Sequence, residues 1–269
     1  MRASARIAGI TGGGGHGWAV HERAREMLAA GRDVTLLTVG DHDIKTDAAV
    51  IDAMDASARG GNLGYSPVAG TPALRAAIAK RIAATTGVAT APSEVLVMAG
   101  GQAALFFAMM AALDPGDACL LIEPFYATFP LTVRAASGRV VSLDAPAETG
   151  FVPRPEEIDA KLAETGARAM LLNSPNNPTG AVYDRAFWEA VAEICIARDV
   201  WLISDEVYES QVHDGERVTP RALPGMAERT LVLGSMSKSH AMTGWRVGWL
   251  VGPESVIGYG ADYAIASTY

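Results

Sequence analysis

The sequence predicts an α/β protein with a mainly parallel sheet and helices on both of its sides. Short apolar runs alternate with helix-length stretches along most of the chain. Several of these runs are continuously apolar, which is typical of strands buried on both faces. Repeated strand–helix units return the chain to the same end of the sheet, so neighbouring strands come to lie parallel.

Composition and charge limit the function. The 269 residues are 49% hydrophobic and 19% charged, and the formal net charge is −8. This profile fits one large globular domain, or a large domain with a small partner domain. A nucleic-acid partner is not expected, because such binding depends on Lys and Arg neutralising phosphates.

The cysteines, histidines and apolar runs suggest neither a secreted nor a metal protein. Cys119 and Cys195 lie in separate apolar segments and are interpreted as small buried hydrophobes. The histidines show no metal-ligand spacing. The N-terminus lacks the apolar stretch of a signal peptide, and the longest apolar run, Ala103–Leu113, is too short to span a bilayer. We therefore expect a cytoplasmic protein without a membrane span.

The elements follow from local patterns. Helical periodicity covers Trp18–Ala30 and Ile44–Ala58, and Val34–Val39 is a β-rich run between them. Thr71 is a suitable N-cap for a helix over Pro72–Thr86. The strands expected after this helix are Val95–Met98, Ala118–Ile122, Arg139–Leu143, Ala167–Leu172, Val200–Ser204 and Thr230–Leu233.

Polar and small residues follow several of these strands, and in open parallel sheets ligands bind beyond the carboxyl ends of the strands. Glycines follow the strand that ends at Met98, and an Asn-rich stretch follows the strand that ends at Leu172. Asp205 follows Ser204, and a serine-rich stretch with Lys238 follows Leu233. The sequence therefore predicts a ligand site at this edge of the sheet.

A phosphate fits part of this edge. Gly100, Gly101 and Gln102 open an apolar helix, where free N–H groups attract anions and glycines permit close approach. Glycine in such a turn also occurs without any ligand. Ser235 and Ser237 offer hydroxyl donors to the same phosphate, and Arg246 offers a guanidinium, whose planar fork binds oxyanions bidentately.

Ionisable residues at the same edge suggest carbonyl chemistry. Lys238 is either a solvated charge or, if buried near positive charge, an amine that loses its proton and attacks carbonyls. Asp205 is either a turn-capping residue or the partner of a protonated ring nitrogen. Tyr208 lies three residues after Asp205, and Asn177 offers an amide donor. Tyr126 is either a core residue or a stacking surface for a flat ring.

Three longer motifs resemble the signature blocks of class I/II aminotransferases, the pyridoxal-phosphate enzymes of fold type I related to aspartate aminotransferase. They are Ser-Pro-Asn-Asn-Pro-Thr-Gly (174–180), Ser-Asp-Glu-Val-Tyr (204–208) and Ser-Met-Ser-Lys-Ser-His-Ala-Met-Thr-Gly-Trp-Arg-Val-Gly (235–248). Shorter matches occur in the same order, at Tyr65, 69–75, 100–102 and 114–117. The resemblance extends from about Val39 to the end of the chain.

The resemblance implies a role for each residue of the central set. Lys238 would form the Schiff base with pyridoxal 5′-phosphate and then act as the general base. Asp205 would pair with the pyridine nitrogen, Tyr208 and Asn177 would contact the phenolic oxygen, and Tyr126 would stack on the ring. The implied reaction moves an amino group from an amino acid to a 2-oxo acid.

The resemblance also assigns the phosphate and the substrate. Phosphate contacts would come from the glycine turn (Gly100, Gly101, Gln102), from Ser235 and Ser237, from Arg246, and from Tyr65 of the neighbouring subunit of a homodimer. Gly40 and Asn177 would face the substrate carboxylate. His42 stands where many members of the family have proline.

The implied architecture is a three-layer sandwich with an incomplete small domain. Residues 1–45 would form an N-terminal arm and part of the small domain, and residues 46–269 the large cofactor-binding domain. The chain ends at Tyr269, before the family's C-terminal segment with its carboxylate-binding arginine. A fragment, or a protein without that clamp, both fit this ending.

Other functions also fit these residues. A lyase or a racemase would use the same lysine and aspartate, and a truncated domain would hold the cofactor without turnover. An NAD site is a further alternative, because Gly12-x-Gly14-x-x-Gly17 follows a possible strand at Arg6–Ile10 and Asp41 closes the next apolar run. In the competing interpretation, these glycines belong to a flexible arm that packs on a partner subunit.

Overall fold

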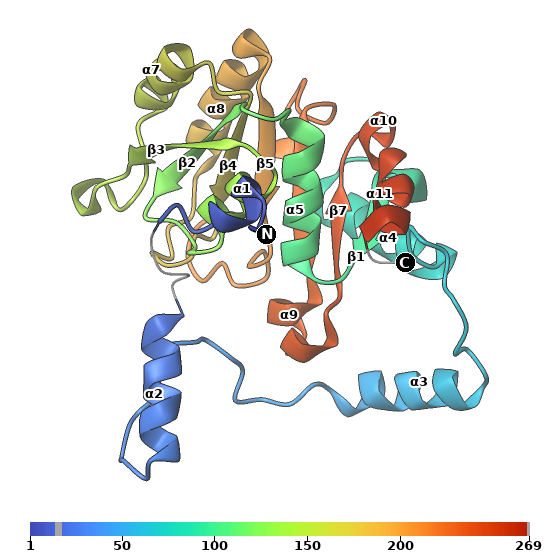
Figure 1. The fold of residues 1–269 in the computed structure, drawn as a ribbon. Helices are drawn as coiled ribbons and strands as arrows, with labels where there is room; N and C mark the ends of the chain where they lie inside the picture. The colour runs from blue at the N-terminus through green and yellow to red at the C-terminus, as the bar shows by residue number, and fades with distance from the viewer. Residues whose placement is uncertain (14–17, 268–269) are drawn as a thin grey trace.

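A computed structural model describes residues 1–13 and 18–267. Within them, seven strands form one sheet in the order β1-β7-β6-β5-β4-β2-β3 (Figure 1). The strands are β1 (Val95–Met98), β2 (Ala118–Glu123), β3 (Arg139–Asp144), β4 (Ala169–Asn173), β5 (Trp201–Asp205), β6 (Thr230–Ser235) and β7 (Gly248–Val251). The pairs formed among β2 to β6 are parallel, and β7 runs antiparallel to both β1 and β6. The expected α/β fold with a mainly parallel sheet is confirmed.

Helices cover both faces of the sheet. They are α1 (Ala5–Ala8), α2 (Ala19–Ala29), α3 (Ala48–Arg59), α4 (Pro72–Thr86), α5 (Gly101–Ala112), α6 (Phe129–Ala135), α7 (Pro155–Thr165), α8 (Arg185–Arg198), α9 (Met236–Ser239), α10 (Glu254–Ile257) and α11 (Tyr259–Ser267). In Figure 1, α2, α3 and the segment that joins them lie outside the layered body. None of the helices in the described part of the chain combines the length and hydropathy that a membrane crossing requires.

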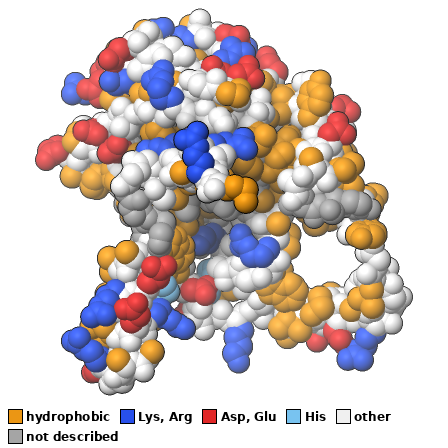
Figure 2. Space-filling model, in the orientation of Figure 1, with side chains coloured by type: hydrophobic (Ala, Val, Ile, Leu, Met, Phe, Trp, Pro, Cys, Tyr) orange, Lys and Arg blue, Asp and Glu red, His pale blue; other side chains and the backbone are white. Residues whose placement is uncertain are grey.

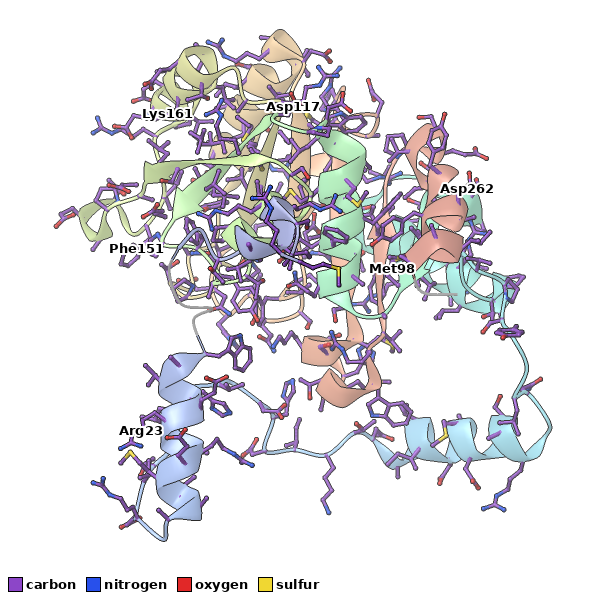
Figure 3. The ribbon with its side chains drawn as sticks, in the orientation of Figure 1. Arg23, Met98, Asp117, Phe151, Lys161 and Asp262 are labelled. Atoms are coloured by element: carbon purple, nitrogen blue, oxygen red, sulfur yellow. The ribbon has the colours of Figure 1, made fainter. Side chains whose placement is uncertain are left out.

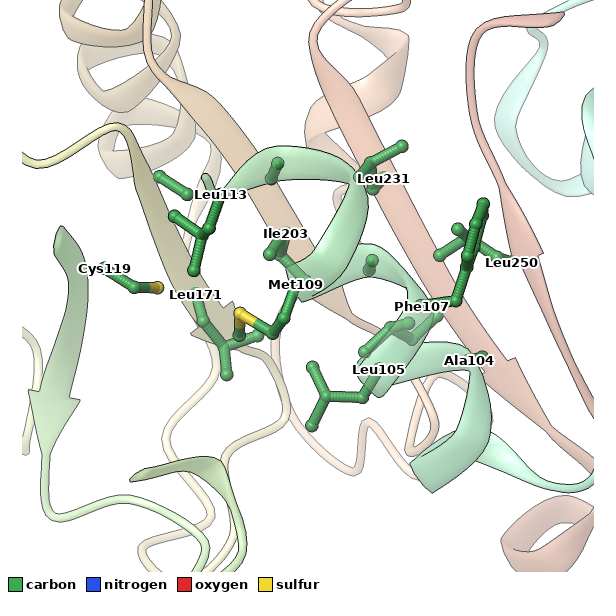
Figure 4. Packing of buried hydrophobic residues seen from close by; sticks show 14 of the residues in the cluster. Ala104, Leu105, Phe107, Met109, Leu113, Cys119, Leu171, Ile203, Leu231 and Leu250 are labelled. Atoms are coloured by element: carbon green, nitrogen blue, oxygen red, sulfur yellow. The ribbon is translucent and has the colours of Figure 1, made fainter. Parts of the chain in front are cut away.

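Alternate residues of the strands point to opposite faces of the sheet, and buried hydrophobic clusters lie on both faces. On one face, α5 and α6 pack on residues such as Leu171 and Ile203. Figure 4 shows Leu105 and Met109 of α5 against this face. On the other face, α7 and α8 pack on residues such as Met170 and Leu202. Because both faces are covered, the continuously apolar strand sequences are explained by burial.

The helix predictions mostly agree with the structure. The helix over Pro72–Thr86 has its predicted bounds, and its N-cap Thr71 accepts a hydrogen bond from the Leu74 N–H at 3.4 Å. The helix predicted from Ile44 begins at Ala48, because the Asp47 carboxylate accepts from the Ala49 N–H at 2.8 Å and caps it there.

Two strand predictions are wrong and one strand was missed. Val34–Val39 forms no strand, and Leu37 is 90% exposed there, since this β-rich run meets no partner strand. The possible strand at Arg6–Ile10 is instead the short helix α1, capped by Ser4. The missed strand is β7, a run of only four residues that begins with a glycine.

The finding at α1 removes the strand that the dinucleotide interpretation requires. That motif needs a strand directly before its glycines, and a helical turn stands in its place. Gly14, His16 and Gly17 of the motif region lie outside the described residues, as does Tyr269.

Candidate active site

A cavity of about 660 Å³ lies at the carboxyl ends of the parallel strands. In Figure 2, the surface is hollowed between α2 and the body of the molecule, with Lys and Arg side chains at the edge of the hollow. The predicted site residues that line the cavity are Gly40, Gly101, Gln102, Tyr126, Asn177, Asp205, Tyr208, Ser235, Ser237, Lys238 and Arg246. The structure therefore brings together residues spread over two hundred positions of sequence.

Lys238 reaches the cavity from α9, the short helix that follows β6 directly. Ser235 ends the strand and caps α9, because its Oγ accepts a hydrogen bond from the Ser237 N–H at 3.0 Å. The Lys238 side chain is half-buried, and its Nζ lies 5.7 Å from the centroid of the Tyr208 ring. The amine thus faces an aromatic ring across the cavity.

Asp205, the last residue of β5, is 8% exposed and lines the same cavity. Burial raises the pKa of Asp205 to about 7, nearby Glu206 adds to the increase, and the Val207 N–H and Lys238 act against it. The Val207 N–H donates to Asp205 Oδ1 at 3.1 Å. A buried carboxyl with this pKa is suited to hold a cationic nitrogen, because a positive partner would stabilise its charged form.

Asn177 and Tyr208 contact each other beside Asp205. The Asn177 Nδ2 donates to the Tyr208 hydroxyl at 3.3 Å, and the Asn177 N–H donates to Asn173 Oδ1 at 2.8 Å. Asn173 Nδ2 in turn donates to the Asp205 carbonyl oxygen at 2.9 Å. Burial raises the pKa of Tyr208, and the Asn177 hydrogen bond opposes that increase. Asn173 was not predicted as a site residue.

An anion cradle forms where α5, β6 and β7 meet. Gly100 precedes α5 with φ of 87°, and a Cβ there would lie 2.4 Å from Arg246 Nη2. A Cβ at Gly248 would lie 2.6 Å from the Gly101 nitrogen. Gly101 and Ser235 line the cavity beside Arg246. Helix N–H groups, a hydroxyl and a guanidinium therefore converge, as phosphate binding requires.

Other predicted residues have different surroundings. Gln102 lines the cavity, but its side-chain amide donates to Thr132 Oγ1 at 2.7 Å and accepts from Thr128 Oγ1 at 2.8 Å. Tyr126 lies at the cavity and packs edge-on against Phe129 at 5.7 Å. Gly100 and Tyr65 do not line the cavity, and Tyr65 is 89% exposed.

The comparisons identify the family. The family model for aminotransferases of class I and II matches residues 32–264. An arginine–pyruvate transaminase of Pseudomonas aeruginosa is 45% identical, over all of this chain and 68% of the transaminase. An aspartate/prephenate aminotransferase of Thermus thermophilus is 39% identical, over 93% of this chain and 64% of that enzyme. The solved aspartate aminotransferase from Thermus thermophilus with maleate superposes with a TM-score of 0.94 at 37% identity, over 100% of this chain and 69% of that one.

The chain belongs to the class I and II aminotransferases. The resemblance drawn from the three motifs is therefore confirmed. This aminotransferase chain spans about two thirds of the length of the relatives, 68% and 64% for the two named enzymes.

One wall of the aminotransferase cavity was missed by the sequence analysis. Trp18, His21 and Thr38 line it from α2 and the segment after α2. The His21 Nδ1 lies 2.7 Å from the Thr38 Oγ1, and the Trp18 and His21 rings pack edge-on at 5.9 Å. No motif marks these residues, because they enter the site only through the path of the chain outside the layered body.

A buried carboxylate behind Asp205 was also missed. Glu206 accepts hydrogen bonds from the hydroxyls of Ser204 at 3.0 Å and Thr219 at 2.6 Å, and it forms an ion pair with Arg217 at 3.3 Å. Burial raises the pKa of Glu206, and these partners oppose the increase. Glu206 does not line the cavity. Its charge nevertheless helps to raise the pKa of the neighbouring Asp205.

Proposed function

We propose that this chain binds pyridoxal 5′-phosphate in the cavity and transfers an amino group between an amino acid and a 2-oxo acid. The observation that carries the proposal is that the Lys238 amine and the buried Asp205 carboxyl line one cavity. Family membership supports the reaction class.

The residues present suit the cofactor's chemical groups. The cradle at Gly101, Ser235 and Arg246 offers donors to a phosphate. Asp205 offers a buried acid with a pKa near 7 to a ring nitrogen. The Asn177–Tyr208 pair offers donors to a ring oxygen. These features match three different polar positions of one flat molecule.

The proposed roles of the chain's residues follow from these contacts. The bound cofactor would supply a carbonyl that captures amines and a ring that withdraws electrons. Lys238 would hold the cofactor and then move a proton at the substrate α-carbon through its Nζ. Asp205 would keep the ring nitrogen protonated, and the anion cradle would fix the ring relative to Lys238. Gly40 and Asn177 would face the substrate carboxylate.

The test begins with cofactor loading. Adding pyridoxal phosphate to the purified chain should produce a chromophore, and borohydride should fix the cofactor to the peptide that carries Lys238. Lys238→Ala should lose this adduct, and its turnover should fall by about 10³-fold or more, since it removes both the attachment point and the base. Lys161→Ala is the control, because Lys161 lies on α7 far from α9 (Figure 3) and pairs with Glu164. Full turnover in Lys238→Ala would contradict the proposal.

Product analysis decides the reaction. The relatives' names suggest arginine with pyruvate and aspartate with 2-oxo acids as first substrates to compare. Formation of the second amino acid indicates transfer. Release of ammonia indicates a lyase, inversion of the substrate indicates a racemase, and loading without any product indicates a cofactor-holding domain.

We further propose a homodimer in which Tyr65 reaches the neighbouring cavity. Its 89% exposure in the single chain, outside the cavity wall, supports that role. The cytoplasmic location stays a prediction. The buried, unpaired thiols of Cys119 and Cys195 are compatible with it.

A further inference from the structure

Residues 41–46, called here the strap, cross the turn that carries Lys238, called here the lysine turn (236–246). The strap belongs to the segment that joins α2 to α3 and also supplies Asp41 to the cavity wall. Three hydrogen bonds join the strap to the lysine turn. Thr46 Oγ1 donates to the Ala241 carbonyl at 2.7 Å and accepts from Trp245 Nε1 at 3.1 Å. Thr243 Oγ1 donates to Asp41 Oδ1 at 3.0 Å.

A fourth contact reaches the residue before Lys238. The His42 Nε2 lies 3.2 Å from the Ser237 carbonyl oxygen, across 195 positions of sequence, and the contact is partly buried. A carbonyl oxygen only accepts hydrogen bonds, so the His42 Nε2 carries the hydrogen. The ring is therefore a donor in this contact whether it is neutral or charged.

This donor meets a need of the lysine turn. Helix α9 has only four residues, and carbonyl groups in the last turn of a helix lack partners within it. His42 satisfies the Ser237 carbonyl, while the Ser237 N–H donates to Ser235 Oγ at 3.0 Å. Ser237 is thus held on both of its backbone polar groups. Since the Ser237 carbonyl belongs to the peptide unit that leads into Lys238, fixing it orients the lysine backbone.

We propose that His42 is a positioning residue for Lys238, acting through its hydrogen bond to the Ser237 carbonyl. The inference rests on the proposed function only in treating Lys238 as the reacting amine. The hydrogen bond fixes the lysine turn against the strap, so the amine and the donors of the anion cradle keep one relative position. Loss of the bond would loosen the turn and reduce the fraction of time that the amine is correctly placed.

The test compares two variants of His42, one that keeps an aromatic ring but has no hydrogen-bond donor and one that keeps a donor but has no ring. His42→Phe keeps an aromatic ring and removes the N–H, whereas His42→Gln keeps an amide donor. His213→Ala is the control, because His213 is exposed and does not line the cavity. Hydrogen–deuterium exchange over residues 236–246 of the full chain without cofactor should be about tenfold faster in His42→Phe and near wild type in His42→Gln and His213→Ala.

A second readout uses the loaded protein. We expect His42→Phe to lower kcat by about tenfold with little change in KM, since one neutral hydrogen bond has that scale. His42→Gln should recover most of the loss. If His42→Phe does not fold, His42→Ala takes its place in the same comparison.

The outcomes separate this inference from the proposed function. Unchanged exchange in His42→Phe overturns the inference, and so does equal acceleration in His42→Phe and His42→Gln, which would indicate packing rather than hydrogen bonding. Failure of the chain to bind pyridoxal phosphate would contradict the proposed function, yet the exchange comparison would still decide whether His42 restrains the lysine turn.

Discussion

The Lys238 amine lies over the ring of Tyr208, and the hydroxyl of that ring accepts a hydrogen bond from Asn177. Tyr208 thus has two separate contacts, one through its face and one through its oxygen. The face attracts a protonated amine, since the ring quadrupole is negative there. The oxygen is held toward the cavity by the Asn177 amide.

Substitutions at Tyr208 should separate these contacts. Tyr208→Phe keeps the ring face and removes the oxygen, so we expect kcat for amino transfer to fall about tenfold. Tyr208→Leu removes both the ring face and the oxygen, so kcat of this variant should fall further. The comparison is made by steady-state kinetics at saturating cofactor. Equal activity of the two variants would show that the ring face contributes nothing.

The buried Asp205 carboxyl makes stability depend on pH. Its pKa rises from 3.8 to about 7 in the folded chain, so the folded state binds a proton that the unfolded state releases between these values. Ionisation of the buried Asp205 carboxyl therefore destabilises the folded chain. This loss of folding stability is absent below pH 3.8, grows as the pH rises from 3.8 to about 7, and is complete above about 7. At about 1.4 kcal/mol per pKa unit, its full size is on the order of 4 kcal/mol.

Asp205→Asn should remove this dependence. Urea unfolding of the cofactor-free chain at pH 4 to 8 should show the variant gaining stability over wild type as pH rises. Asp159→Asn is the control, because the hydrogen bond from Arg198 lowers the pKa of Asp159 below its ordinary value of 3.8. The stability that Asp159 contributes therefore changes below pH 4, and between pH 4 and 8 the curve of this variant should run nearly parallel to that of wild type. Parallel stability curves for Asp205→Asn and wild type would contradict the prediction.

Gly100→Ala should weaken the anion cradle. The new Cβ would lie 2.4 Å from Arg246 Nη2, at a backbone φ of 87° that L residues rarely adopt. We expect pyridoxal phosphate to bind about tenfold or more weakly, because the displaced guanidinium loses a charge-assisted contact. Gly116→Ala is the matched control, with φ of 96° and nothing within 4 Å of its Cβ. Both variants should lose about 1–2 kcal/mol of folding stability from the backbone, so equal affinities would refute the steric argument.

Mixed dimers should test Tyr65. If Tyr65 serves the neighbouring cavity, chains carrying Tyr65→Phe and chains carrying Lys238→Ala should complement each other after mixing, because one cavity of the hybrid has both native residues. Tyr65→Phe alone should bind the cofactor about tenfold more weakly. A monomer in sedimentation, or no recovery on mixing, would remove the proposed role.

Local sequence patterns predicted the layered fold well. Apolar runs such as Thr230–Leu233 became strands, here Thr230–Ser235, because burial on both faces leaves a continuous apolar signal. Lys238 and Asp205 could be predicted as site residues because each follows the end of an apolar run, and parallel strands present their carboxyl ends at one edge of the sheet. These predictions needed only the order of the strands along the chain.

Contacts over long sequence distances were not predictable in this way. Val34–Val39 has strand composition but meets no partner, and Gly248–Val251 is a strand because β1 and β6 lie on either side of it. The contact between His42 and Ser237 likewise depends on where the strap crosses the lysine turn. Such relationships arise from tertiary packing, which overrides local preference.

The backbone contact of Gly248 with Gly101 has a mechanical consequence. A side chain at 248 would act as a wedge between two loops, one that begins α5 and one that returns from Lys238 and Arg246 to β7. With only a hydrogen there, the loops meet directly and displacement of one transmits to the other. The position of a bound anion and the position of the Lys238 amine are therefore expected to change together when either loop moves.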